Sequence, residues 1–253
     1  MKTAETERGL AELLRSLAEV KNTLRQLERR IDEDIPRQIA SNFQAIEALV
    51  AVYRVMDSRP ALPEFARPGS GWAISPELAR LAIEQILVYR PSMIVEFGSG
   101  TSTHVFAQIA KDLPGTRIVS FEHDSLWYAN TLVELSSQGL DNVDLRYAPL
   151  MPTEIQGQEF LWYDKSSMSD LSEIDFVVVD GPPGHVGPEA RYPTCPMLES
   201  KCAPGCVWIV DDTIREDEKN MVKRWIREFN LELLLEQTWN GKGATVLRTP
   251  SER

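Results

Sequence analysis

Apolar residues near the start of the chain follow a helical repeat. From Leu10 to Ile31 they recur at alternating steps of three and four, and charged residues fill the positions between them. This spacing predicts an amphipathic helix with one narrow apolar seam, which is typical of a coiled coil. The repeat slips near Pro36, where the missing backbone N–H predicts a kink or a new helix start. We interpret residues 10–56 as a homo-oligomerisation segment; the alternative is a helical hairpin that folds back on its own chain.

Beyond this segment the pattern changes to short apolar runs separated by helical spacing. A stretch rich in proline and glycine, residues 59–71, predicts a linker between a helical part, residues 1–58, and a larger domain, residues 72–253. Short apolar runs predict strands at 93–97, 117–122, 143–147, 176–179 and 206–210. Helical spacing predicts helices at 76–89, 101–112, 126–138 and 215–229.

The end of the chain carries a hairpin signal around Asn240–Gly243. Alternating strands and helices that finish in such a hairpin predict an α/β fold, with a doubly wound, mostly parallel sheet and an antiparallel terminal hairpin. Residues 149–173 show little periodicity, so we expect a loop or a short insertion there. Residues 188–200 contain two prolines and are expected to be only partly helical.

Glycines follow the strand predicted at 93–97, in the sequence MIVEFGSGTST. Gly98 and Gly100 have no side chain, so the backbone of this turn can approach a ligand closely. The free N–H groups of the helix that follows suit a polar or negative ligand group. A dinucleotide fingerprint would need a third glycine where Thr103 stands. The turn alone therefore predicts a nucleotide-like ligand without naming it.

Acidic residues stand where four predicted strands end. They are Glu96, Glu122, Asp180 and the pair Asp211–Asp212. Ligands of open α/β sheets bind beyond the carboxyl ends of the strands, so these acids are expected on the side of the sheet that binds ligands. An acid at the end of the second strand can accept both ribose hydroxyls of an adenosine cofactor, either NAD or S-adenosylmethionine (AdoMet). Each acid taken singly is equally explained as a turn former or a helix cap.

The ordered set of these features resembles class I AdoMet-dependent methyltransferases over about residues 72–253. The resemblance rests on the E-x-G-x-G turn, the acid in SFEHD, the run VVVDGPPG and the terminal hairpin. It implies a Rossmann-like seven-stranded sheet and a methyl transfer to a hydroxyl of a small acceptor, such as a sugar, a glycan-related compound or another metabolite. The cofactor-binding residues that it implies are Glu96, Gly98, Ser99, Gly100, Thr101, Ser102, Glu122 and His123.

A narrower resemblance concerns the last two acidic strand ends. Asp180, Asp211 and Asp212 are similar to the divalent-metal site of catechol-type and macrolide-sugar O-methyltransferases. Carboxylate oxygens suit Mg²⁺, which would lower the pKa of an acceptor hydroxyl and orient it. Asp180 and His185 are the candidate catalytic residues, with His185 as a general base. Helix capping by Asp212 and a plain loop position for His185 are the alternatives. Loop location alone suggests three residues for the lining of an acceptor pocket: Tyr163, Arg191 and Tyr192.

Composition narrows the partners. The formal net charge is −11, and residues 59–253 hold eighteen Lys/Arg against twenty-eight Asp/Glu. Such an acidic domain repels a phosphate backbone, so we expect no nucleic-acid partner. No apolar run reaches membrane-spanning length, no secretory signal is visible, and three cysteines form no C-x-x-C pair. We therefore expect a cytoplasmic protein that does not bind membranes.

Two further functions fit the same features. One is an NAD- or nucleotide-dependent Rossmann enzyme, which the missing third glycine disfavours. The other is an assembly protein in which the coiled coil is the active part and the α/β domain has lost catalysis. The acids and glycines of the cofactor turn favour retained cofactor binding over this second alternative.

Overall fold

The computed structural model describes residues 2–56, 73–239 and 241–251, with side chains described from residue 14 onward. Two compact units divide it, Met1–Gln44 and Ala45–Arg253. The predicted linker at 59–71 lies outside the described residues. None of the described helices is both long enough and apolar enough to cross a lipid bilayer.

The N-terminal segment is helical throughout its described length. An α-helix, α1 (Lys2–Arg29), passes into a π-helical turn, η1 (Arg30–Asp34), and then into α2 (Ile35–Val55). The new helix starts at Ile35, next to Pro36, as the sequence predicts. Near its end α2 belongs to the larger unit, where Val52 and Met56 are buried in a hydrophobic core. Met56 is therefore a core residue, which corrects its assignment to the exposed seam.

The larger unit is built on a seven-stranded sheet with the order β3-β2-β1-β6-β7-β9-β8. β3, β2, β1, β6 and β7 run parallel, while β9 lies antiparallel to β7 and to β8. This arrangement confirms the predicted doubly wound sheet with an antiparallel terminal hairpin. The strands are β1 (Met93–Phe97), β2 (Arg117–Glu122), β3 (Val143–Tyr147), β6 (Ile174–Val179), β7 (Cys202–Asp211), β8 (Glu232–Trp239) and β9 (Lys242–Arg248).

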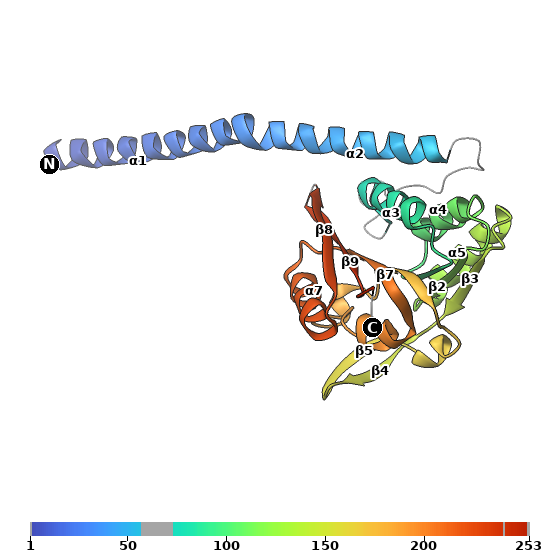
Figure 1. Cartoon of the computed structure of the whole chain (residues 1–253). Helices are drawn as coiled ribbons and strands as arrows, with labels where there is room; N and C mark the ends of the chain where they lie inside the picture. The colour runs from blue at the N-terminus through green and yellow to red at the C-terminus, as the bar shows by residue number, and fades with distance from the viewer. Residues whose placement is uncertain (1, 57–72, 240, 252–253) are drawn as a thin grey trace. The chain divides into compact units, whose positions relative to one another are not determined.

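Helices cover both faces of this sheet (Figure 1). Successive residues of each strand point to opposite faces, so Ile94 and Val95 enter different hydrophobic clusters. One face is covered by α3 (Pro76–Tyr89), α4 (Thr101–Ala110) and α5 (Ser125–Ser137). The other is covered by α6 (Thr194–Leu198) and α7 (Glu216–Phe229). Three short 3-10 helices complete the unit, η2 (Lys165–Met168), η3 (Gly184–Val186) and η4 (Glu199–Lys201).

Local signals fix the helix ends that position the sheet. The Oγ of Ser75 accepts a hydrogen bond from the N–H of Leu78 at 3.2 Å, and Pro76 occupies the first turn of α3. The helix ends at Arg90, whose φ of 48° is left-handed. Arg90 is followed by Pro91, which has no N–H to continue a helix. α3 thereby delivers the chain directly to the start of β1.

Residues 149–173 were expected to be a loop or a short insertion, and they contain a β-hairpin. β4 (Leu150–Ile155) pairs antiparallel with β5 (Gln158–Tyr163) through a tight turn. Both turn residues, Gln156 and Gly157, have positive φ, the backbone that two-residue hairpins require. The buried rings of Trp162 and Tyr163 pack from this hairpin onto the core at Phe97. Gln-Gly is a weaker turn signal than Asn-Gly, and the residues on either side of it do not alternate cleanly between apolar and polar.

Candidate functional site

The glycine turn lies between β1 and α4, and its two glycines have different surroundings. Gly98 has φ +95°, and a Cβ placed on it would lie 3.3 Å from the backbone carbon and oxygen of Asp180. Its lack of a side chain therefore serves the close approach of β6. Gly100 has φ +147°, and a Cβ there would meet no atom within 4 Å. Gly100 thus borders open space, as expected of backbone that faces a ligand.

Thr103, which stands where a dinucleotide fingerprint would have glycine, ties the turn to the end of β1. The N–H of Gly100 donates to Thr103 Oγ1 at 2.9 Å, and this hydroxyl donates to Glu96 Oε2 at 2.6 Å. Ser120 on β2 donates to the same carboxylate oxygen at 2.7 Å. Glu96 thereby holds both the turn and the neighbouring strand in place.

Glu96 is completely buried, and burial raises its pKa to about 7. Hydrogen bonds from Ser102, Thr103 and Ser120 oppose that rise, and the charge of Glu122 adds to it. Its second oxygen, Oε1, has no hydrogen-bond partner among the described residues. Near neutral pH this carboxyl is therefore balanced between its neutral and charged forms, and a nearby cationic group would favour the charged form.

Glu122, at the end of β2, lies against the same turn. Its Oε2 accepts bonds from the backbone N–H of Ser99 at 3.0 Å and from the Ser99 hydroxyl at 3.1 Å. Its Oε1 accepts from the N–H groups of His123 and Asp124, both at 2.8 Å, and lies 3.1 Å from His123 Nδ1. Burial alone raises the pKa of Glu122, but the bonds from His123, Asp124 and Ser99 outweigh it and leave the pKa below its ordinary value.

The predicted cofactor residues therefore gather at one place. Glu96 and Glu122 extend from neighbouring strands to the same face, because Glu96 is level with Ser120 and Glu122 lies two residues further on. Thr101 and Ser102 form the first turn of α4. The side chain of His123 is a quarter exposed and meets Tyr163 edge-on, with ring centroids 6.0 Å apart.

The second group of acids gathers at the ends of β6 and β7. Oxygen atoms of Asp180, Asp211 and Asp212 lie within 4.8 Å of one another, so the predicted cluster forms. The guanidinium of Arg191 lies among them, with Nη2 3.3 Å from Asp180 Oδ1 and 3.2 Å from Asp212 Oδ2. Arg215 makes a further ion pair with Asp212 at 2.8 Å. Asp212 thus pairs with two arginines, whereas the N-cap residue of α7 is Arg215.

Burial and mutual repulsion raise the pKa values of two of these acids, Asp180 and Asp211. Burial raises the pKa of Asp180 to about 6, with Arg191 opposing the rise and Asp212 adding to it. Burial, with the charges of Asp180 and Asp212, raises the pKa of Asp211 well above its usual range. Asp180 keeps about a fifth of its side chain exposed. It is therefore the member of the cluster that a ligand reaches most directly.

The three carboxylates have the donor chemistry of a magnesium site, but Arg191 does not fit a divalent ion in the same place. Its Nε donates to the carbonyl of Pro182 and its Nη1 to the carbonyl of Asp211, both at 3.1 Å. Only 4% of the side chain is exposed. A guanidinium anchored in this way cannot withdraw, so a divalent cation bound by the same oxygens would lie beside a fixed positive charge.

The candidates outside these two groups of acids are His185, Tyr163 and Tyr192. His185 is exposed on η3, and its role as a base stays a prediction. The hydroxyl of Tyr163 is buried without a partner among the described residues, and a Cβ on Gly181 would lie 2.1 Å from it. It therefore faces the loop that carries Asp180. Tyr192, expected at an acceptor pocket, instead donates its hydroxyl to Glu228 on α7 at 2.5 Å.

Sequence reasoning placed Arg191 near the acceptor from its loop position alone. It did not predict that this arginine neutralises the acids. His104 was missed entirely, although its Nδ1 lies 2.9 Å from the carbonyl oxygen of Gly100. Neither residue carries a local motif, so only the folded arrangement shows its partners.

The fold is the one found in AdoMet-dependent methyltransferases of known structure, as the sequence resemblance predicts. Residues 95–213 match the family model described as a methyltransferase domain. No match was found among curated proteins.

Solved structures with the same fold include three methyltransferases. The first is PaMTH1 from Podospora anserina, bound to S-adenosylhomocysteine (13% identity, 86% of this chain and 96% of that chain, TM-score 0.60). The second is the O-methyltransferase TomG from Streptomyces achromogenes, in complex with AdoMet (15% identity, 81% of this chain and 89% of that chain, TM-score 0.53). The third is an O-methyltransferase from Bacillus cereus with S-adenosylhomocysteine (14% identity, 85% of this chain and 97% of that chain, TM-score 0.53).

Proposed function

We propose that this chain is an AdoMet-dependent methyltransferase that methylates a hydroxyl group of a small acceptor, such as a sugar or another hydroxylated metabolite. One observation carries the proposal: the open glycine turn and the ionised Glu122 lie directly beside the loop that carries Asp180. A cofactor site and an acidic acceptor site thus adjoin across β1 and β6. The structural neighbours TomG and the Bacillus cereus protein are O-methyltransferases, which supports oxygen as the acceptor atom.

The chain's own residues suit the two ends of the cofactor. Glu122 would accept the ribose hydroxyls, exchanging its bonds to the Ser99 side chain and loop backbone for bonds to the ligand. The first N–H groups of α4 and the backbone of Gly100 would meet the methionine carboxylate. The amino group would favour the charged form of Glu96, whose Oε1 lacks a partner. The residues present therefore fit AdoMet.

AdoMet held there would supply an electrophilic sulfonium methyl group for transfer to the acceptor oxygen, with S-adenosylhomocysteine as the leaving group. The acceptor must lose its hydroxyl proton, and Asp180 accepts it. This carboxylate is partly exposed, and its raised pKa of about 6 makes it a stronger base than an ordinary aspartate while leaving it mostly ionised at neutral pH. Arg191 keeps it oriented. Catalysis then rests on positioning and proton removal.

No step is assigned to a metal ion. Arg191 supplies the positive charge among Asp180, Asp211 and Asp212 that Mg²⁺ would otherwise supply. A chelator is accordingly expected to leave turnover intact. Loss of turnover in the chelator, restored by Mg²⁺, would return the metal to the mechanism.

Cofactor binding is tested first, by thermal unfolding of the full chain with AdoMet or NAD. At a hundredfold excess over the dissociation constant, AdoMet should stabilise the fold by about 2.7 kcal/mol, which raises Tm by about 5–10 °C. NAD should leave Tm unchanged. Glu122→Ala should lose most of the AdoMet shift, while Glu154→Ala on the β4–β5 hairpin is the matched control. A shift with NAD and none with AdoMet would favour the oxidoreductase alternative.

Catalysis is tested by release of S-adenosylhomocysteine in the presence of a panel of hydroxylated acceptors. Asp180→Asn should abolish release while it preserves the AdoMet shift in Tm, and His185→Gln should retain release. The opposite result would make His185 the base. Binding of AdoMet without release for any acceptor would favour the assembly-protein alternative.

A further inference from the structure

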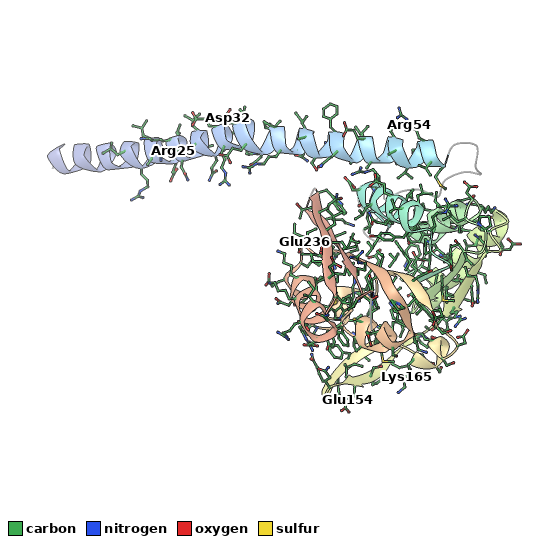
Figure 2. All side chains as sticks on the ribbon, viewed as in Figure 1. Arg25, Asp32, Arg54, Glu154, Lys165 and Glu236 are labelled. Carbon is green, nitrogen blue, oxygen red and sulfur yellow. The ribbon has the colours of Figure 1, made fainter. Side chains whose placement is uncertain are left out.

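The N-terminal helix carries a row of apolar side chains that nothing else in its own compact unit covers. We define the stripe as the apolar residues on one face of α1, η1 and the first turns of α2. Each of them is 46–62% exposed. The stripe consists of Leu17, Val20, Leu24, Leu27, Ile31, Ile35, Ile39 and Phe43. All lie within the unit Met1–Gln44. Figure 2 shows labelled charged side chains, Arg25 and Asp32, standing away from the same helix.

The spacing of the stripe changes where the helix changes. From Leu17 to Ile31 the steps are three, four, three and four, but from Ile31 to Phe43 they are four, four and four. In an unbroken α-helix, three steps of four advance by twelve residues where three turns need only about 10.8, so the stripe would rotate by roughly 120°. A seam that rotated so far could not face a single partner helix along its whole length.

The π-helical turn removes this rotation. η1 (Arg30–Asp34) has the wider hydrogen bond of a π-helix, from the N–H of Ile35 to the carbonyl of Arg30. Such a turn takes up about one extra residue, so most of the drift is absorbed at the place where the repeat slips. Pro36 allows it, because its missing N–H already interrupts the α-helical bonds there. The fold thus keeps two differently phased repeats on one face.

We propose that this stripe is the seam of a coiled coil between copies of this chain. From Leu17 to Ile31 the steps average 3.5 residues, which is the coiled-coil spacing. Such a narrow seam fits an identical helix, since knobs of one copy enter holes of the other. Most of the stability of a helix in a protein comes from packing of its apolar face, which this helix lacks within its own compact unit.

The charges beside the stripe also suit a second copy. Residues 1–58 hold nine Lys/Arg and ten Asp/Glu, so two such helices do not repel each other as two acidic domains would. Both signs alternate along the helix, for example in the Arg29–Glu33–Arg37 chain of ion pairs at 3.7 Å and 3.5 Å. From Leu17 to Phe43 the seam runs about 40 Å, at roughly 1.5 Å per residue.

The test is the mass of the full chain in solution, measured by light scattering after size exclusion at micromolar concentration. The unmodified chain should give a mass of two or more copies of the 28.6 kDa chain. Leu24→Glu with Ile31→Glu should reduce it to one copy. Asn22→Glu with Gln26→Glu adds the same charge to the opposite side of the helix and should keep the multiple. A single-copy mass for the unmodified chain would overturn the proposal.

The role of the π turn has its own test. Deleting Asp32 removes the one residue that the wide turn takes up, so an ordinary α-helical turn should then keep the two halves of the stripe in phase, and the association constant should stay nearly unchanged. Deleting Asp32 together with Asp34 removes one residue more, which rotates one half of the stripe by about 100° and should lower the association constant at least tenfold. Equal association of the two variants would show that seam continuity plays no part. Circular dichroism should show that both variants remain helical.

Discussion

Arg191 is the residue whose replacement tests the site most directly. Arg191→Met removes a guanidinium that contacts Asp180 and Asp212 and donates to two backbone carbonyls, with only 4% of the side chain exposed. The methionine fills similar volume but leaves the buried carboxylates of Asp211 and Asp212, and the partly buried one of Asp180, without their main counter-charge. Removing one partner from a buried ionic group costs about 3–5 kcal/mol. For a domain of this size that corresponds to a Tm about 6–20 °C lower.

The matched control is Arg146→Met. Arg146 also bridges two carboxylates, those of Asp144 and Asp170, at 2.6 Å and 2.7 Å. These partners are 45% and 60% exposed, so the pairs are solvated and their loss should cost about 1 kcal/mol or less. Urea unfolding of both variants near pH 7 measures the difference. Equal losses in the two variants would refute the idea that Arg191 neutralises buried charge.

Binding of Mg²⁺ supplies a second comparison, between the unmodified chain and Arg191→Met. While Arg191 is present, millimolar Mg²⁺ should leave Tm unchanged. Arg191→Met should gain a Mg²⁺-dependent rise in Tm, because the three carboxylates are then free to bind a hard cation. A rise in the unmodified chain would show that the ion and the guanidinium coexist.

Three further outcomes follow from the site. The folded state binds the Glu96 proton more tightly than the unfolded chain does, because its pKa is raised to about 7. The free energy of unfolding should therefore fall by about 3 kcal/mol as pH rises from about 4.5 to 7. Glu96→Gln should flatten this part of the curve of unfolding free energy against pH. Gly98→Ala should destabilise the fold by about 1–3 kcal/mol more than Gly100→Ala in urea unfolding, since only Gly98 lies against β6, and equal losses would contradict the close approach. Tyr163→Phe should keep or raise Tm, because it removes a buried hydroxyl that has no partner among the described residues.

The sequence predicted the strands of the parallel sheet and their acidic ends because those features depend on local pattern. Glu96, Glu122 and Asp180 each end an apolar run, and parallel strands bring their carboxyl ends to one edge. The restart of the helix beside Pro36 was predictable for the same reason, since a missing N–H acts locally.

What the sequence could not predict depends on contacts across the fold. Arg191 follows Asp180 by eleven residues, and no local pattern tells which carboxylates a buried guanidinium will meet. The hairpin at 150–163 was missed because its strands lack clean alternation, so Gln156 and Gly157 gave no recognisable turn signal. That Met56 belongs to the hydrophobic core, and not to the seam, likewise became clear only from the packing of the larger unit.

Gly98 lies against the backbone of Asp180, so the positions of the turn after β1 and of the loop after β6 depend on each other. Neither loop can gain a side chain or an extra residue at this point without displacing the other. Under the proposed function, changes in acceptor preference are therefore expected in parts that do not share the contact, such as the β4–β5 hairpin and the segment around η3. Directed evolution of new acceptors would do best to vary those two segments and leave the glycines alone.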